Sequence, residues 1–115
     1  MIRKPSETTV EKRRNMRGGA GEVTIRNFFS KEDFKAKVRL CASMSLPPGA
    51  SIGLHQHETE DEVYIVTAGS GLLDDTKTQT PVSAGDAILT GRGESHAISN
   101  DGKTNLEIIA VIMCY

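Results

Sequence analysis

The residues of this sequence best suited to chemistry are its histidines, of which the chain has three. His55 and His57 stand two positions apart, so on a β-strand both imidazoles project from the same face. The polar segment 58–61 is suited to a turn, and Glu62 then opens a strand that would return opposite the histidine pair. His96 lies far along the chain in another strand. Closure of a small barrel would bring it across the interior to the other three residues.

These four residues would supply three imidazole nitrogens and one carboxylate oxygen to one divalent transition metal. The donor set suits Mn, Fe, Co, Ni, Cu or Zn, whereas Ca and Mg prefer oxygen ligands alone. The sequence does not select among Mn, Fe, Zn, Ni and Co. A five- or six-coordinate ion held in this way keeps one or two positions open for water, dioxygen or an anionic chelating molecule. The alternative is three ordinary surface histidines among acidic neighbours, and residue types alone leave both interpretations open.

Glycines flank the first three candidate ligands at a defined spacing. Gly49 is followed by five residues, His55-x-His57, four residues, Glu62, six residues and Gly69. This order resembles the first sequence motif of the cupin family and matches it at every defining position.

A second segment contains the fourth candidate ligand. Gly85 is followed by five residues, Gly91, one residue, Gly93, two residues, His96, three residues and Asn100. This order resembles the second cupin motif, with Gly91 in the position of a proline. Because both gaps and ligand types coincide, the chain is identified as a member of the small single-domain cupins, the type-2 conserved barrel family.

The resemblance implies a fold and a set of roles. The fold is a double-stranded β-helix, or jelly-roll barrel, with the metal in its interior on His55, His57, Glu62 and His96. The motif glycines and Asn100 would lie at tight turns, and Gly91 in place of proline implies a looser turn before His96.

The remainder of the sequence also indicates an all-β protein. From Val38 to Leu46 every second residue is apolar, and Pro47-Pro48-Gly49 ends the run. Ser30 with acidic residues behind it predicts one short helical turn over 30–34. Gly, Asn, Asp or Pro separates nearly all of the further predicted strands, a pattern typical of a sandwich or barrel. These strands are predicted over 22–28, 51–57, 62–68, 71–74, 79–82, 87–90, 96–99 and 106–113.

Residues 1–22 are predicted to form a short N-terminal arm, followed by the cupin barrel over 23–115. The arm contains six basic residues and ends in a glycine cluster at 18–21. Glu7 and Glu11 dilute the positive charge, and no aromatic residue is available to stack on bases, so we expect no nucleic-acid partner.

Composition limits the function further. At 115 residues the chain has room for one domain, and its net charge of -1 gives no attraction to nucleic acid or anionic membranes. No apolar stretch approaches the roughly 20 residues that cross a bilayer, and the polar opening lacks the apolar middle of a secretory signal. We therefore expect a cytoplasmic protein. Cys41 and Cys114 are expected to be free thiols, mostly buried.

The last predicted strand differs from the others. Residues 106–113 are apolar on both faces after Glu107, so the outer face should also be covered. Either a homodimer interface or the N-terminal arm would cover it, and we expect a homodimer.

Three residues are candidates for a catalytic role beside the metal. If Glu62 faces inward, strand alternation sends Tyr64 inward too, as a proton donor to substrate or as a core tyrosine with a structural partner. Arg39 shares a face with Cys41 and would be a clamp for a substrate anion if that face is interior. Arg92, flanked by glycines, is either an anion contact at the barrel mouth or a solvated loop residue.

The cupins include dioxygenases, decarboxylases, isomerases and non-catalytic binding proteins, so the fold does not select a reaction. The intact ligand set favours a metal-dependent enzyme acting on a small polar or carboxylate-bearing metabolite, with an anionic ligand at the open metal positions. The alternative is a non-catalytic small-molecule-binding or sensing cupin. Oxalate decarboxylase and oxalate oxidase use the same ligand types, but the decarboxylase has an arginine three residues before the first histidine. Ile52 holds that position here, which weakens the oxalate interpretation.

Overall fold

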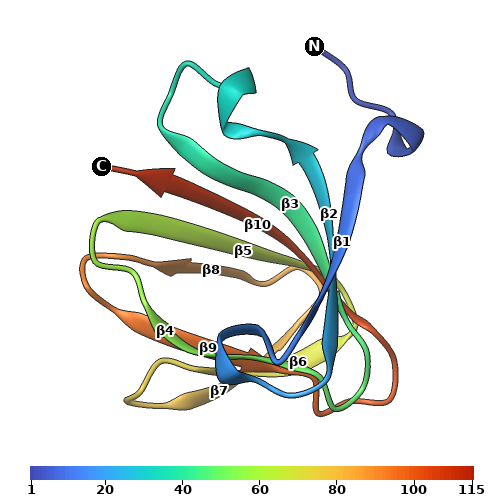
Figure 1. Ribbon diagram of the computed structural model, residues 1–115. Coiled ribbons are helices and arrows are strands. Elements are labelled where there is room, and N and C mark those ends of the chain that lie inside the picture. Colours follow the sequence, from blue (N-terminus) through green and yellow to red (C-terminus); the bar gives the residue numbers. More distant parts are fainter.

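The computed structural model describes residues 1–115 as two antiparallel sheets that face each other, close together at one end and splayed apart at the other (Figure 1). The larger sheet has six strands and the smaller has four. In spatial order the larger sheet contains β1 (Thr9–Arg14), β2 (Glu22–Phe29), β3 (Val38–Leu46), β10 (Leu106–Cys114), β5 (Glu60–Ala68) and β8 (Ala87–Thr90). The smaller contains β4 (Ser51–Gln56), β9 (Ser95–Ser99), β6 (Ser70–Asp74) and β7 (Gln79–Ser83). Three short 3-10 turns complete the fold: η1 (Pro5–Glu7), η2 (Met16–Gly18) and η3 (Lys31–Asp33).

The core lies between the two sheets because alternate residues of each strand point inward. In the centre of the larger sheet Ala42 pairs with Ala110 and Met44 with Ile108, and all four are buried. Buried residues of the smaller sheet close the core from the other side: Ile52, Leu73, Val82 and Ile98.

The predicted all-β barrel is confirmed. Nine of the ten strands coincide with predicted segments to within two residues at either end. The predicted helical turn is η3, where the Ser30 backbone N–H donates to the Asp33 carboxylate at 2.9 Å.

The segment 1–22, which the sequence indicates as an arm, contains strand β1. It pairs with β2 over six residues, from Thr9 opposite Asn27 to Arg14 opposite Glu22. All of its side chains are exposed, so it has none of the apolar alternation that identifies a strand in a sequence. Backbone hydrogen bonds to β2 hold β1 at the edge of the sheet. Its charged side chains disfavour the addition of another strand at that edge.

Strand β10 is apolar on both faces, as the sequence indicates. Strands β2 and β3 separate it from β1, so the N-terminal segment does not cover its outer face. On that face apolar side chains of β10 lie beside those of β5 and β8, where Ile65 is 41% and Leu89 69% exposed. We call this surface the outer apolar face, which consists of Val63, Ile65, Leu89, Ile109 and Val111.

A β-bulge interrupts strand β3 near its start. Met113 pairs with Val38 and Ile112 with Leu40, so Arg39 has no partner on β10. A bulge re-aims the side chain that it carries. Arg39 therefore leaves the regular alternation with Cys41, on which its predicted place was based.

Two further expectations concern the cysteines and the membrane. Cys41 and Cys114 are free, and each is partly buried rather than fully enclosed. None of the helical segments is long and apolar enough to span a bilayer.

Candidate metal centre

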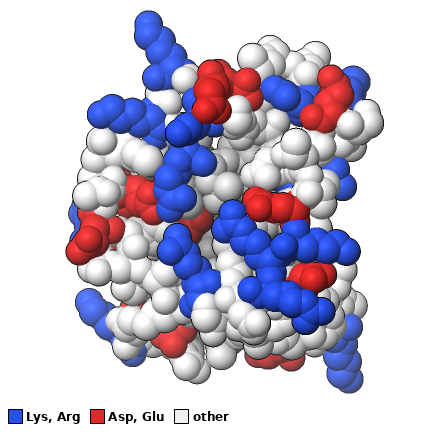
Figure 2. Space-filling model, in the orientation of Figure 1, with Lys and Arg blue, Asp and Glu red and all other residues white.

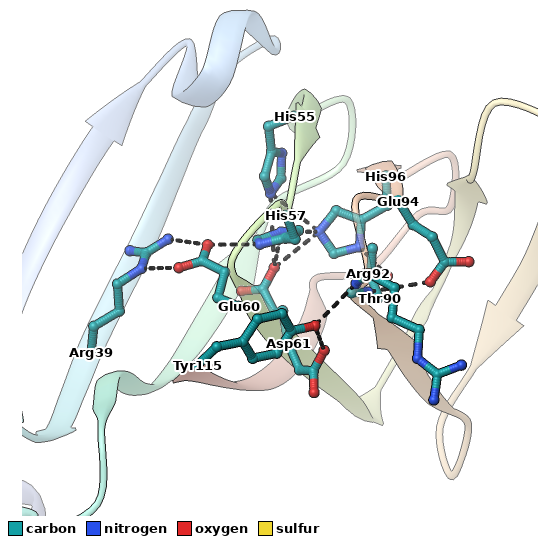
Figure 3. Close-up of polar contacts among 12 residues, drawn as sticks. Arg39, His55, His57, Glu60, Asp61, Thr90, Arg92, Glu94, His96 and Tyr115 are labelled. Atoms are coloured by element: carbon teal, nitrogen blue, oxygen red, sulfur yellow. Dashed lines mark hydrogen bonds and ion pairs between the residues drawn. The ribbon is translucent and has the colours of Figure 1, made fainter.

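The four predicted ligands lie together in one cluster. Figure 3 shows the rings of His55, His57 and His96 turned toward one another. His55 and His96 are direct cross-strand neighbours on β4 and β9, His57 follows the end of β4, and Glu62 faces them from β5 of the other sheet. Their ligand atoms all lie within 4.8 Å of one another. His57, Glu62 and His96 are buried, and His55 is nearly so.

The Nε2 atoms of the histidines converge on one point. His96 Nε2 lies 3.1 Å from the Nε2 of both His55 and His57. The Glu62 carboxylate oxygen lies 2.9 Å from His96 Nε2, 3.0 Å from His57 Nε2 and 3.8 Å from His55 Nε2. Nitrogen lone pairs this close repel each other unless a cation lies between them.

The opposite ring nitrogen of each histidine is held from outside the centre. His55 Nδ1 donates to the Gly53 carbonyl at 2.7 Å, and His57 Nδ1 donates to the Glu60 carboxylate at 2.8 Å. Since both acceptors lack a hydrogen, the ring proton must sit on Nδ1, and the Nε2 lone pair is free to bind a metal. His96 Nδ1 lies 2.8 Å from the Thr90 hydroxyl, which can donate or accept.

The charge states of the centre suit a cation. Burial alone would raise the pKa of Glu62, but the rings of His55 and His96 outweigh it and bring that pKa down to about 2. Burial lowers the pKa of His96, which favours the neutral imidazole. An ionised carboxylate and neutral imidazoles are the forms that ligate metals.

Glu60 is a component of this centre that the sequence reasoning missed. Besides accepting from His57, its carboxylate accepts from Nε and a terminal nitrogen of Arg39 at 2.6 and 2.7 Å (Figure 3). The Arg39 hydrogen bond is the main cause that lowers the pKa of Glu60 to about 2. Extending the alternation of Glu62 and Tyr64 back by two residues would have found it. Glu60 was missed because the polar segment 58–61 was interpreted as a turn.

Tyr64 and Arg39 both lie beside the centre. Tyr64 is fully buried and stacks on the His96 ring with the centroids 4.8 Å apart and an angle of 15° between the planes. Burial and then the charge of Glu62 raise the pKa of Tyr64 well above its ordinary value, so the phenol keeps its proton. Arg39 reaches the centre from the bulge on β3 and is paired with Glu60, rather than extending from an interior face.

Arg92 lies away from the centre. It sits in the turn before β9 with a left-handed φ of 57°, is exposed, and its backbone N–H donates to the Tyr115 hydroxyl at 3.1 Å. The same hydroxyl donates to the Asp61 carboxylate at 2.7 Å. A β-carbon at Gly91 would overlap that carboxylate. Glycine in place of the motif proline therefore leaves room for Asp61 in its contact with Tyr115.

A cavity of about 270 Å³ opens onto the centre. His55, His57, Glu62 and Tyr64 form its floor, and its walls include charged residues of the N-terminal segment that sequence reasoning did not select: Glu11, Arg13 and Arg17. Basic side chains flank the hollow on this face of the molecule (Figure 2). No motif marks these residues in the sequence, because they reach the cavity only through the pairing of β1 with β2.

The spacing of the ligand atoms fits a transition ion. With metal–ligand bonds of about 2.0–2.2 Å, two ligands at right angles to each other lie about 3 Å apart. The separations of 2.9–3.1 Å between most ligand atoms match that arrangement. His55, His57, Glu62 and His96 therefore fit one divalent ion with nitrogen and oxygen ligands.

Comparison with known proteins agrees with the fold and the motifs. The sequence profile of the cupin domain matches residues 42–112. An oxalate-binding protein of Thermotoga maritima is 49% identical over 113 residues, which cover 98% of this chain and 93% of that protein. A crystal structure from Thermotoga maritima, described as that of a predicted oxalate decarboxylase, superimposes with a TM-score of 0.95 at 48% identity and full coverage of both chains. The polyketide cyclase RemF of Streptomyces resistomycificus is more distant, with a TM-score of 0.75, 25% identity, and coverage of 100% of this chain and 81% of its own. With its two motifs, its two-sheet barrel and these matches, the chain belongs to the cupin family.

Proposed function

We propose that this protein binds a small dicarboxylate, oxalate or a close analogue, at one divalent transition ion held by His55, His57, Glu62 and His96. The observation that carries the proposal is the convergence of the three Nε2 atoms, with Nδ1 of His55 and His57 donating to acceptors outside the centre. That arrangement directs the nitrogen lone pairs at a cation. In a metal-free core the same lone pairs would repel one another.

The metal positions that the protein leaves open indicate the class of ligand. The near right angles inferred above suit a six-coordinate ion, on which four protein ligands leave two positions. A dicarboxylate can occupy both with one oxygen from each end. Its charge would also be offset, because one carboxylate on a divalent ion leaves the centre positive.

The size and charge of the cavity support a small anion. At about 270 Å³ it lies just below the roughly 300–1,000 Å³ of pockets for drug-sized ligands. Its walls carry Arg13, Arg17 and Arg39. The position three residues before the first histidine, where the decarboxylase has an arginine, is held here by the buried Ile52. Arg13, Arg17 and Arg39 supply positive charge from other elements instead. The name of the Thermotoga maritima relative, an oxalate-binding protein, points to the same ligand.

A second candidate function is catalysis on the bound carboxylate, as in a decarboxylase, oxygenase or isomerase. The bound ion would supply a Lewis acid or an oxygen-binding centre. The observation that favours catalysis is Glu11, a carboxylate of the cavity wall outside the ligand cluster, paired with Arg13 at 3.3 Å. At that position Glu11 would accept or return a proton, while Tyr64 keeps its own.

Calorimetry with the purified full chain tests the binding proposal. Protein loaded with manganese, and separately with iron, cobalt, nickel or zinc, is titrated with oxalate, and with acetate as a monocarboxylate control. We expect saturable oxalate binding that requires the metal and is tighter than acetate binding. Metal-loaded protein that takes up no oxalate would refute the proposal. Release of formate or carbon dioxide from oxalate by the same protein, lost in Glu11→Gln, would establish the catalytic candidate.

We also propose that two copies pair through the outer apolar face defined above. Ile65 and Leu89 are exposed on the adjacent strands β5 and β8, beside partly buried apolar side chains of β10. Contiguous apolar surface of this kind marks interaction sites.

A further inference from the structure

The turn η2 stands over the candidate metal centre although it belongs to the N-terminal segment. Its Arg17 lines the cavity together with His55, His57 and Tyr64. Arg17 therefore reaches the cavity that opens onto the metal centre.

The turn and the residues that follow it are fixed to β4 of the smaller sheet by hydrogen bonds and close packing. Ser51 donates from its backbone N–H to the Ala20 carbonyl at 2.8 Å, and its hydroxyl accepts from the Ala20 N–H at 2.8 Å. The carbonyl of Arg17 lies so close to Gly53 that a β-carbon there would overlap it. Position 53 must therefore be glycine for the turn to pack, and Gly53 also holds the ring of His55.

Arg17 itself adopts a conformation that side chains disfavour. Its φ of 54° lies in the left-handed region, where residues other than glycine, asparagine and aspartate are uncommon. Such strain is maintained when the surrounding structure determines it, and it gathers at ligand sites. Here the packing of η2 on β4 determines it.

Arg17 also differs from the other two arginines of the cavity in its partners. Arg13 is paired with Glu11 at 3.3 Å and Arg39 with Glu60 at 2.6 Å. Arg17 is paired with no carboxylate of the protein. It is the arginine of the cavity whose planar fork is available to an incoming carboxylate.

We propose that Arg17 binds the bound dicarboxylate through the oxygens that do not face the metal, and so makes the site select dicarboxylates over monocarboxylates. This inference rests on the proposed function, since it concerns the ligand of the same centre. It assigns to η2 the role of a rim that recognises the ligand, separate from the residues that hold the metal.

The test uses the manganese-loaded full chain and two anions, oxalate and acetate. Arg17→Asn removes the guanidinium but keeps a residue that tolerates a positive φ, and Arg17→Gly is a second variant with the same property. Arg14→Gln is the matched control, because it removes an equal charge from the exposed end of β1, where Arg14 contacts Glu22 rather than the cavity.

We expect both Arg17 variants to bind oxalate roughly ten- to a hundredfold more weakly, the loss typical of a charged hydrogen-bonded pair. Acetate affinity, metal content and melting temperature should stay at wild-type values, as should every property of Arg14→Gln. An equal loss of acetate and oxalate affinity, or a loss as large in Arg14→Gln, would overturn the role in selectivity. Unchanged oxalate binding in the Arg17 variants overturns the inference alone. Wild-type protein that holds metal but no oxalate overturns the proposed function, and the inference with it.

Discussion

Glu60 accepts a hydrogen bond of 2.8 Å from His57 Nδ1, and the two residues lie three positions apart in the chain. The contact fixes the tautomer of His57 and aims its Nε2 at the centre. Arg39 fixes Glu60 in turn, so a residue of the β3 bulge controls the orientation of a candidate metal ligand.

Glu60→Gln should therefore weaken metal binding without abolishing it. Loss of a carboxylate partner of a metal-binding histidine typically costs about 10–100-fold in affinity. Competition against a chelating dye measures the dissociation constant. Glu58→Gln serves as the control, since Glu58 is exposed and outside the ligand cluster. Equal affinities for Glu60→Gln and wild type would show that the contact does not position His57.

His96→Ala should remove most of the metal. Its Nε2 lies within 3.1 Å of the other three ligand atoms, so its loss opens the centre of the cluster. Metal analysis of protein purified without chelators should find about one ion per chain in the wild type and far less in the variant. Glu94→Gln, two residues away with its carboxylate on the Gly91 N–H, should keep its metal. A fully loaded His96→Ala protein would refute the four-ligand assignment.

Removal of the Tyr64 side chain should destabilise the protein strongly. The ring is fully buried and stacked on His96, and truncation of a buried aromatic residue costs about 3–5 kcal/mol. Tyr115→Ala deletes the same side chain from a position that is 58% exposed and should cost much less. Urea unfolding of the two variants gives the comparison. Similar losses in both would argue against a packing role for Tyr64.

Gly53→Ala should loosen η2 from β4. A β-carbon there would overlap the Arg17 carbonyl, and overpacking of this kind costs about 1–3 kcal/mol. Gly102→Ala is the control, because its nearest contact would be at 3.2 Å to the Ser70 hydroxyl. Urea unfolding reports stability, and protease cleavage between residues 15 and 21 reports the turn. If Gly53→Ala were as stable and as resistant as Gly102→Ala, the close packing of the turn would be disproved.

The outer apolar face should control self-association. Leu89→Lys places a charge on the most exposed side chain of that face, on the edge strand β8, and should convert a dimer to a monomer in sedimentation velocity. Leu54→Lys is the matched control, since Leu54 is 55% exposed but belongs to β4 of the other sheet. A wild-type chain that sediments as a monomer would contradict the proposed pairing.

Much of the fold was predictable because most strands bury one face. In such strands apolar and polar residues alternate along the sequence. Val38–Leu46 was placed without error, and the inward set of Glu62, Tyr64 and Val66 is confirmed by their burial. Strand β1 was not predictable, since it buries no side chain and is held by backbone pairing that leaves no pattern in residue types.

The candidate centre divides in the same way. Motif spacing predicted the four candidate ligands, because it indicates which residues share a strand face. They are His55, His57, Glu62 and His96. Arg17 was not found, because its position depends on how a strand distant from the motifs pairs. Arg39 lies at the cavity and has the acidic partner Glu60, but a bulge rather than regular strand alternation places it there.

The ligand cluster joins parts of the chain that are otherwise connected mainly through the core. Glu62 comes from the larger sheet and the three histidines from the smaller one and its adjoining turn, at the end where the sheets are splayed. A bound ion would cross-link the two sheets of the barrel. It would close chain loops of 34 residues, from Glu62 to His96, and 41 residues, from His55 to His96, much as a disulfide does. Removal of the metal would then increase local opening most at the splayed end. Amide hydrogen exchange along β4, β5 and β9 would be faster in the metal-free protein than in the metal-loaded protein.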